Sequence, residues 1–490
     1  MANTESTATG GAAARRLWPD YRTVWRWHFY AGLICIPFII WLSATGSIYL
    51  FKPQIETWLD RPYDHLGSPG PARPPSAQVQ AALAAAPGTT LRAYELPPSP
   101  DAPARVILSR GAEQVRVLVR PDTLQVLRIQ NEDDRPMRVL FRLHGELLAG
   151  DRGSNVVELA ACWAIVMLIT GLYLWWPRGA SGLAGVVWPR FGGGSRLFWR
   201  DLHAVTGVWV SFFALVLLLT GLPWADNWGN YLREVRRLTG TAAASQDWTS
   251  GRRMELNQRR AGDAGVRSAL AADGGEHAGM PGMTMPGMDM EGMDMGDMGG
   301  ASTHGPDDPF SPLDRMVPTV AALHLPPPVS ISPPGRAHGP WTAKSDTPNR
   351  PQRVNLTLDA ASGAVLSRTN FSQRHWIDQV VGTGVAAHEG QLFGPLNQAL
   401  GVFTALGLIL MSASAGVMWW RRRPGGELGA PAASKGRQAA PGLFVVLTLL
   451  CLYLPLLGAS LLAVLGLEWL VLRRIEPVAR WLGLEPARAV

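Results

Sequence analysis

The sequence predicts a mainly α membrane protein. We expect a helical bundle of four core spans in two parallel repeats, a C-terminal apolar segment, and two small α+β modules outside the membrane. Of the 490 residues, 47% are hydrophobic and only 17% are charged, and the apolar residues form long blocks separated by stretches rich in Pro, Gly and charge. Matching spacings between histidines and glycines in the two halves indicate an internal repeat.

Five apolar blocks are long enough to cross a bilayer. The first is too long for a cleavable signal and lacks a small-residue cleavage site, so we expect it to remain as an anchor. The last contains Pro455 and Gly458, and two alternatives stay open for it: one kinked span or a hairpin of two short helices. The predicted blocks are 24–51, 156–176, 202–224, 396–420 and 443–472.

Basic residues cluster at the ends of these blocks and not on one soluble face, so the net charge of +7 does not indicate a nucleic-acid partner. By the positive-inside rule they orient the chain as a multi-pass protein of the bacterial inner (cytoplasmic) membrane, surrounded by membrane lipid, with two large periplasmic loops. The expected cytoplasmic segments are 1–23, 177–201 and 421–442, the periplasmic segments begin at 52 and 225, and a tail follows at 473–490.

The repeat is visible in the spacing of four histidines. His28 and His203 each precede the glycine of a Thr-Gly pair, Gly46 and Gly221, by 18 residues. His144 and His388 precede Gly171 and Gly416 by 27 and 28 residues, and each is followed four residues later by Leu and six later by Gly. The second span of each repeat closes on a Trp pair and positive charge, which suits a membrane interface.

Each repeat also holds an external segment, 52–140 in the first and 225–385 in the second. The first segment predicts a helix at 76–86 and strands at 91–95, 105–109, 114–119 and 124–130. The second predicts a helix at 312–323 and strands at 329–331, 353–358 and 365–368. Residues 240–308 lack periodicity and are rich in Gly, Ala, Asp and Met, so we expect a mobile, disordered insert there.

The orientation sorts the four histidines into an inner pair, His28 with His203, and an outer pair, His144 with His388. A histidine on each of two neighbouring helices can approach a haem iron from opposite sides, and two such ligands leave no open position, so electron transfer is the natural role. The sequence thus predicts two haems within segments 24–51, 141–176, 202–224 and 386–420. Arg26, Arg142, Arg200 and Trp27 are candidates to pair haem propionates or pack the macrocycle, although interface anchoring is their commoner role.

The chain resembles the bacterial PepSY-associated transmembrane (PepSY-TM) proteins, which include iron-uptake-associated proteins and ferric-siderophore reductases. The resemblance covers nearly all of the chain except the Met-rich insert and is carried by WRWHFYAGL, LFRLHGELLAGDRG, GLYLWWPR, WRDLHAVTGVW, LTGLPWA, AAHEGQLFG and VMWWRRRP. It implies that the external modules are PepSY-like and that the matching histidines are haem b ligands.

The insert holds eight of the fifteen methionines of the chain. Thioether sulfur is a soft ligand that selects Cu(I), and interleaved carboxylates add harder ligands, so copper capture is one interpretation and a disordered linker without a metal role is the other. The candidate ligands are Met280, Met283, Met285, Met288, Met290, Met293, Met295 and Met298.

These features predict a transmembrane haem-dependent metal reductase that delivers electrons to periplasmic ferric iron, a ferric siderophore or Cu(II). No nucleotide- or flavin-binding fingerprint occurs, so the expected electron donor is a quinol or a separate cytoplasmic reductase. The alternative is a non-enzymatic, membrane-anchored PepSY protein that senses or binds copper, a peptide or a peptidase. A permease is a third class, which we disfavour because no buried carboxylates are expected in the spans.

Overall fold

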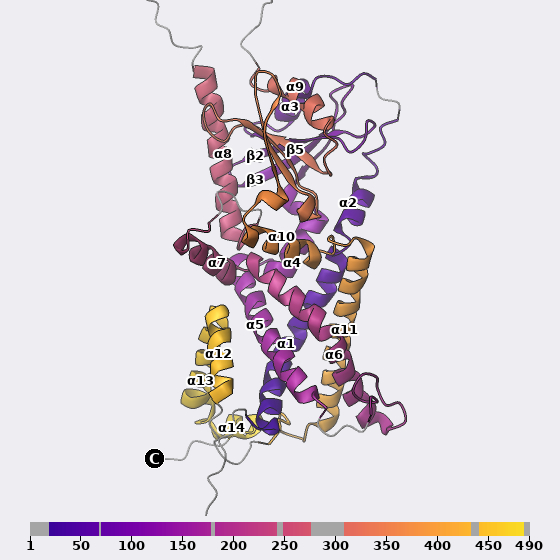
Figure 1. The fold of residues 1–490 in the computed structure, drawn as a ribbon, viewed down its shortest axis with the longest axis vertical. Helices are drawn as coiled ribbons and strands as arrows, with labels where there is room; N and C mark the ends of the chain where they lie inside the picture. The colour runs from indigo at the N-terminus through magenta and orange to yellow at the C-terminus, as the bar shows by residue number, and fades with distance from the viewer. Residues whose placement is uncertain are drawn as a thin grey trace, which may run out of the picture. The chain divides into compact units, whose positions relative to one another are not determined.

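The computed structural model describes residues 19–67, 70–177, 182–242, 248–275, 308–432 and 441–484. The chain divides into two compact units, and each is described by itself. The helical unit comprises Met1–Ile48, His144–Ala242 and Ala399–Val490, and the sheet unit comprises Tyr49–Leu143 and Ala243–Gln398. Figure 1 shows the helices and the sheet with the labels used below.

Four long apolar helices form the core of the helical unit, as the sequence predicts. They are α1 (Tyr21–Tyr49), α5 (Gly150–Trp175), α6 (Gly194–Gly221) and α11 (Pro395–Arg422), and each is long and apolar enough to cross a membrane. Many of their large apolar side chains are exposed, among them Phe212 at 69% and Leu406 at 60%. Such a surface suits lipid, where a helix satisfies its own backbone hydrogen bonds and presents hydrocarbon outward.

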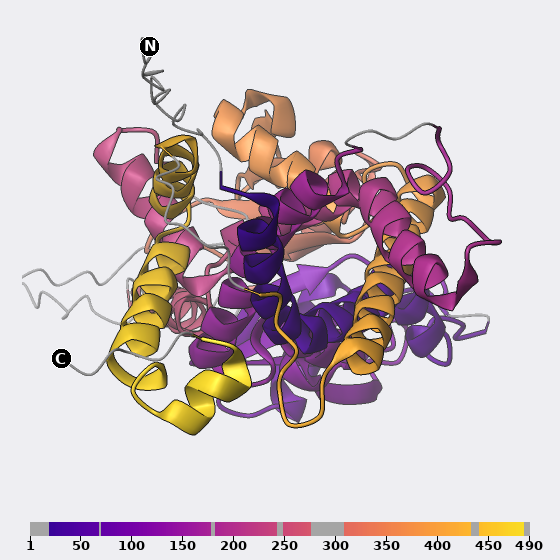
Figure 2. The ribbon, with the colours of Figure 1, turned by 90° about the horizontal axis from the view of Figure 1, so that it is seen from below.

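The last apolar block consists of two helices, α12 (Pro441–Tyr453) and α13 (Pro455–Leu467), which the structure separates at Leu454. Pro455 favours this break, because proline disfavours helical backbone at the residue before it. Arg26 donates to the carbonyl oxygens of Pro431, which precedes α12, and of Gly483, which follows α13. The two ends of this segment therefore lie close together. The geometry is therefore that of the hairpin. Figure 2 shows α12 and α13 at one side of the helical unit and α11 at the other.

A buried carboxylate in α5 corrects one expectation from the sequence. Glu158 is only 2% exposed, and its Oε2 accepts hydrogen bonds from the backbone N–H groups of Asn227 and Trp228. These groups open α7 (Asp226–Leu238), which follows the short turn η2 (Leu222–Trp224). A carboxylate at this end of a helix satisfies otherwise unpaired donors and suits the helix dipole. The expected lack of buried carboxylates in the spans is thus wrong, but Glu158 has a structural partner.

The sheet unit contains one antiparallel sheet of eight strands in the order β4-β3-β2-β1-β5-β6-β7-β8. Its two halves join where β1 pairs with β5, at Tyr94 opposite Ile331 and Glu95 opposite Ser330. The two predicted α+β modules therefore share one sheet, and β6 was not predicted. The strands are β1 (Thr90–Glu95), β2 (Ala104–Arg110), β3 (Glu113–Val119), β4 (Val126–Asn131), β5 (Val329–Ser332), β6 (Trp341–Ser345), β7 (Val354–Leu358) and β8 (Val365–Asn370).

One hydrophobic core serves both halves of the sheet. Val79 of α3 (Pro75–Ala85) and Met316 of α9 (Pro312–Ala321) belong to the same buried cluster as strand residues such as Val106 and Leu356. The two helices also meet directly, because the Ser76 backbone N–H and hydroxyl each donate to the carboxylate of Asp314 at 2.8 Å. The two modules therefore fold as one body.

Part of the expected mobile insert is a helix, which corrects the prediction for residues 252–275. Helix α8 (Arg252–Gly275) packs on β1 and β2, with Val266 and Ala269 buried. Asp263 on this helix accepts hydrogen bonds from Thr90 and Ser109. Burial raises the pKa of Asp263, but its hydrogen bonds, first among them that from Arg267, outweigh burial and lower the pKa to about 2. The Met-rich tract of the insert lies outside the described residues.

Candidate haem-ligand histidines

The structure brings His28 and His203 together. His28 lies in the second turn of α1 and His203 lies in α6, in the same unit. Their ring centroids are 6.5 Å apart and their planes are inclined by 81°. The sequence predicted this pair from its topology, and the structure places the two nearly perpendicular rings close together in the helical unit.

The hydrogen bonds of both rings define the nitrogen left for a ligand. His203 Nδ1 lies 3.0 Å from the carbonyl oxygen of Met411, which can only accept, so Nδ1 carries the proton. His28 Nδ1 lies 2.9 Å from Thr170 Oγ1, whose own proton is donated to Val166 O at 2.8 Å. Both imidazoles therefore donate from Nδ1, and each keeps its Nε2 lone pair for a metal.

The surroundings of the two rings repeat as well. Gly32 lies four residues after His28, and a Cβ there would come within 3.3 Å of Met167 Cε. Gly207 lies four residues after His203, and a Cβ there would come within 3.3 Å of Met411 Cε. Three residues beyond each methionine stands a hydroxyl that contacts the histidine: Thr170 at 2.9 Å and Ser414 at 3.3 Å. The same local arrangement thus occurs twice around one pair of imidazoles.

His144 makes the same kind of contact as His28. It lies in the last turn of α4 (Pro136–Glu146), and its Nδ1 is 2.9 Å from Thr45 Oγ1, which donates its own proton to Trp41 O. A Cβ on Gly46 would lie 3.1 Å from His144 Cε1, and one on Gly171 would lie 3.2 Å from the same atom of His28. Two of the glycines that marked the repeat therefore allow a helix backbone to approach an imidazole.

His388 is the last residue of α10 (Trp376–His388) and belongs to the sheet unit, whereas His144 belongs to the helical unit. The pairing of these two histidines stays a prediction. The backbone after them supports the repeat, since Gly150 and Gly394, each six residues beyond its histidine, have φ values of +61° and +59°. This left-handed conformation favours glycine and explains why the spacing occurs in both halves.

The basic residues near the inner pair differ in their partners. Arg26 is bound to the C-terminal segment, and Arg200 pairs with Asp201 at 2.7 Å. Arg422, which sequence reasoning missed, stacks on two aromatic rings that flank His28 in the sequence, 5.1 Å from the centroid of Trp25 and 5.4 Å from that of Phe29. The aromatic residues within three positions of His28 were the available signal, but the sequence does not identify the cation that stacks on them.

Among the residues that the structure describes, no group of three or more His, Cys, Asp or Glu is arranged to hold a metal ion. The predicted methionine ligands Met280–Met298 lie outside that part of the chain. Three of the remaining histidines have local roles at the surface: His65 pairs with Asp101 at 3.5 Å, His324 contacts the Ala322 carbonyl, and His375 caps α10.

The apolar helices and the sheet define the class of the chain, a multi-pass membrane protein with an antiparallel β module. The family model of the PepSY-associated TM region matches residues 25–422, and the chain belongs to this family. No curated protein matches the chain. Because the match ends at Arg422, the last residue of α11, the hairpin α12–α13 lies beyond it.

Proposed function

We propose that the protein is a haem-containing oxidoreductase of the bacterial inner membrane that carries electrons through two bis-histidine haems to a periplasmic metal acceptor. His28 and His203 would hold the inner haem b, and His144 and His388 the outer one. When bound, such a six-coordinate haem supplies reversible one-electron transfer. A quinol or a cytoplasmic reductase would be the donor.

The spacing of the inner pair is the observation that carries this proposal. Imidazole nitrogens bind first-row metals at about 2.0–2.1 Å, so two rings on opposite sides of one ion have centroids roughly 6 Å apart. The centroids of His28 and His203 are 6.5 Å apart. In each ring the hydrogen bond is made by Nδ1, so Nε2 is left to bind a metal. The residues present therefore fit an axial pair of haem ligands.

The chemistry of the donor set favours haem over a bare metal ion. Two imidazoles without a third protein ligand leave a bare ion under-coordinated, whereas a porphyrin provides four further nitrogens in one plane. Gly171 keeps the backbone of α5 close to the His28 ring and leaves no side chain between them. The protein would thus contribute the two imidazole ligands, their fixed tautomers and a water-poor setting.

Ferric iron, a ferric siderophore and Cu(II) are the candidate acceptors. The methionine-rich tract supports copper, because clustered thioethers bind Cu(I), the product of Cu(II) reduction. Family membership is compatible with an iron acceptor, given the resemblance to ferric-siderophore reductases. The tract would then bind the copper ion.

The test is to purify the full chain in detergent and record its reduced-minus-oxidised spectrum together with its haem content. We expect a low-spin haem b signal and two haems per chain. His28→Ala should remove one haem, and His28→Ala with His388→Ala should remove both. His65→Ala is the matched control, because His65 is exposed and lies outside the proposed sites.

Absence of a low-spin signal from the wild-type chain would refute the proposal, as would two haems retained in the double variant. The non-enzymatic alternative, a membrane-anchored binding or sensing protein, predicts that first result. If the chain binds haem but the reduced haem is not reoxidised by Fe(III) or Cu(II), the proposed haem sites stand and these acceptors are excluded.

A further inference from the structure

A small cavity in the sheet unit lies between α2 (Lys52–Asp60), strand β4 and the start of α4. Its volume is about 50 Å³. Since one water needs about 10–15 Å³ by this measure, the cavity has room for a few water-sized groups and not for a large molecule. It is lined by Glu56, Leu59, Asp60, Arg128, Gln130, Arg135, Pro136 and Met137.

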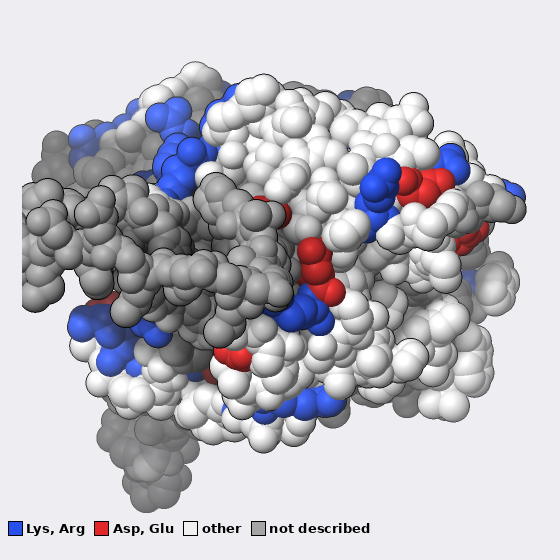
Figure 3. Space-filling view, turned by 90° about the horizontal axis from the view of Figure 1, so that it is seen from above, with Lys and Arg blue, Asp and Glu red and all other residues white. Residues whose placement is uncertain are grey.

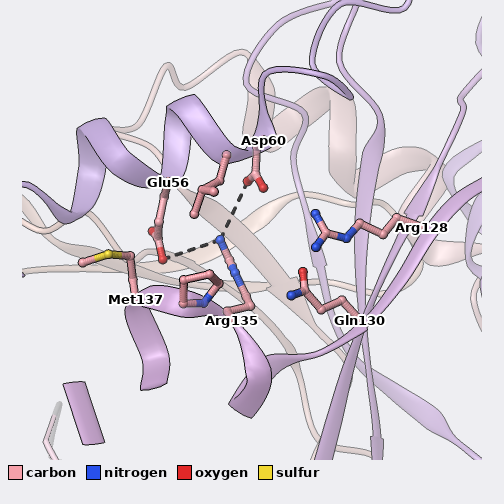
Figure 4. Close-up of a pocket in the computed structure, with 8 residues that line it drawn as sticks. Glu56, Asp60, Arg128, Gln130, Arg135 and Met137 are labelled. Atoms are coloured by element: carbon pink, nitrogen blue, oxygen red, sulfur yellow. Dashed lines mark ion pairs between the residues drawn. The ribbon is translucent and has the colours of Figure 1, made fainter. Parts of the chain in front are cut away.

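The two arginines of this cavity differ in their partners (Figure 4). Arg135 lies between the carboxylates of α2, 3.5 Å from Glu56 and 3.7 Å from Asp60. The guanidinium of Arg128 forms no hydrogen bond or ion pair with any residue that the structure describes, and it stacks 5.3 Å from the ring centroid of Tyr63. Arg128 is therefore the cation whose donors remain for a ligand.

The side chains of Arg128 and Gln130 lie on the same face of β4. They are two residues apart on a strand, so their side chains point to one face, whereas Ile129 between them points away and is 49% exposed. Figure 4 shows both side chains directed toward α2 and Arg135. A planar guanidinium beside a carboxamide offers several N–H donors, which matches the two oxygens of a carboxylate.

Lys52 of α2 interacts electrostatically with one lining residue of the cavity, Glu56, and with Glu389. The pKa of Lys52 is raised by Tyr49 first, and also by the carboxylates of Glu56 and Glu389. Lys52, Glu56 and Glu389 all belong to the sheet unit.

We propose that this cavity binds a free carboxylate arm of a metal chelate through Arg128 and Gln130, and so selects carboxylate-bearing chelates as the metal acceptor. This inference rests on the proposed function for its acceptor role. The cavity admits one carboxylate and its neighbouring atoms, so the metal and the remainder of the chelate stay outside. Arg135 keeps the carboxylates of Glu56 and Asp60 occupied, which limits their repulsion of the ligand.

The test measures binding of gallium(III) citrate to the full chain in detergent by calorimetry. Gallium(III) is not reduced, so binding is separated from electron transfer. We expect Arg128→Gln to raise Kd by roughly 10- to 100-fold and Arg128→Lys to raise it less, because a bidentate charge-assisted contact is lost. Gln130→Ala should raise Kd by a few-fold. Arg110→Gln is the control, since Arg110 is an exposed partner of Glu113 outside the cavity.

Two further ligands identify what the cavity recognises. Metal-free citrate should bind through the same arginine, and a neutral gallium trihydroxamate without a free carboxylate should bind no better to the wild type than to Arg128→Gln. An unchanged citrate Kd in both Arg128→Gln and Gln130→Ala would overturn the inference. An increase in the trihydroxamate Kd as large as that in the citrate Kd would also overturn it. A chain that lacks haem but binds citrate through Arg128 would refute the proposed function and leave this site standing.

Discussion

Replacing Thr170 by valine should weaken haem binding at the inner pair, because it removes the acceptor that fixes His28 and keeps the side-chain shape. Thr170 Oγ1 lies 2.9 Å from His28 Nδ1. A buried N–H that loses its partner costs about 1–3 kcal/mol. Loss of such an orienting contact lowers metal affinity by about 10- to 100-fold. We expect faster loss of one haem and a higher midpoint potential for it, since the imidazole becomes a weaker donor.

Two matched variants sharpen this prediction. Ser414→Ala removes a hydroxyl 3.3 Å from His203 Nδ1 but leaves the Met411 carbonyl at 3.0 Å, so the expected change in affinity is about twofold or less. Thr45→Val removes the acceptor of His144 and should affect the other haem. Each haem would then be assigned from the variant that changes its spectroscopic signal.

The assay is haem transfer from the detergent-solubilised chain to excess apomyoglobin, combined with a spectroscopic redox titration. The reasoning fails if Ser414→Ala loosens haem more than Thr170→Val does. It also fails if Thr170→Val and Thr45→Val change the same haem, because the two hydroxyls contact different histidines.

Three further predictions test other parts of the molecule. Gly171→Val should lower the inner haem occupancy, measured as haem per chain, because even a Cβ there lies 3.2 Å from His28 Cε1 and overpacking costs about 1–3 kcal/mol. Asp263→Asn should destabilise the chain at neutral pH and flatten its melting temperature between pH 3.8 and about 2, since a lowered carboxyl pKa gives stability that is lost as pH falls through that window. Deleting Met280–Met298 should slow reoxidation by Cu(II) and leave reoxidation by Fe(III) unchanged, as stopped-flow spectroscopy would show.

The sequence predicts the core spans and the inner histidine pair because each depends on a local pattern. Apolar length identifies a span, and charge at its ends assigns which histidines share a depth. The pairing of His28 with His203 follows from that depth and from equal spacings to Gly46 and Gly221. The structural role of the glycines could not be predicted from the sequence. Spacing along one helix does not reveal that Gly171 faces a histidine of another helix.

The missed features of the sheet unit are long-range. Pairing of β1 with β5 depends on contacts between residues more than 200 positions apart, such as Tyr94 and Ile331, and no local pattern encodes it. Helix α8 was missed because residues 240–308 were interpreted as one insert: the helix-forming Arg, Ala and Leu residues of 252–275 were averaged with the Gly-rich and Asp-rich remainder. Asp263 is the residue that anchors it to β1 and β2, through Thr90 and Ser109.

Duplication would allow the proposed two-ligand site to form from one histidine of each repeat. In the sheet unit the equivalent strands β1 and β5 pair with each other, and in the helical unit His28 on the first helix of one half faces His203 on the first helix of the other. A metal bound between equivalent residues receives similar ligands from both sides without any further design. The two rings differ in the acceptor that orients each of them, a hydroxyl of Thr170 for His28 and the carbonyl of Met411 for His203. A single substitution can remove a side-chain acceptor but not a backbone acceptor. The orientation of His28 is therefore more easily lost by mutation than that of His203.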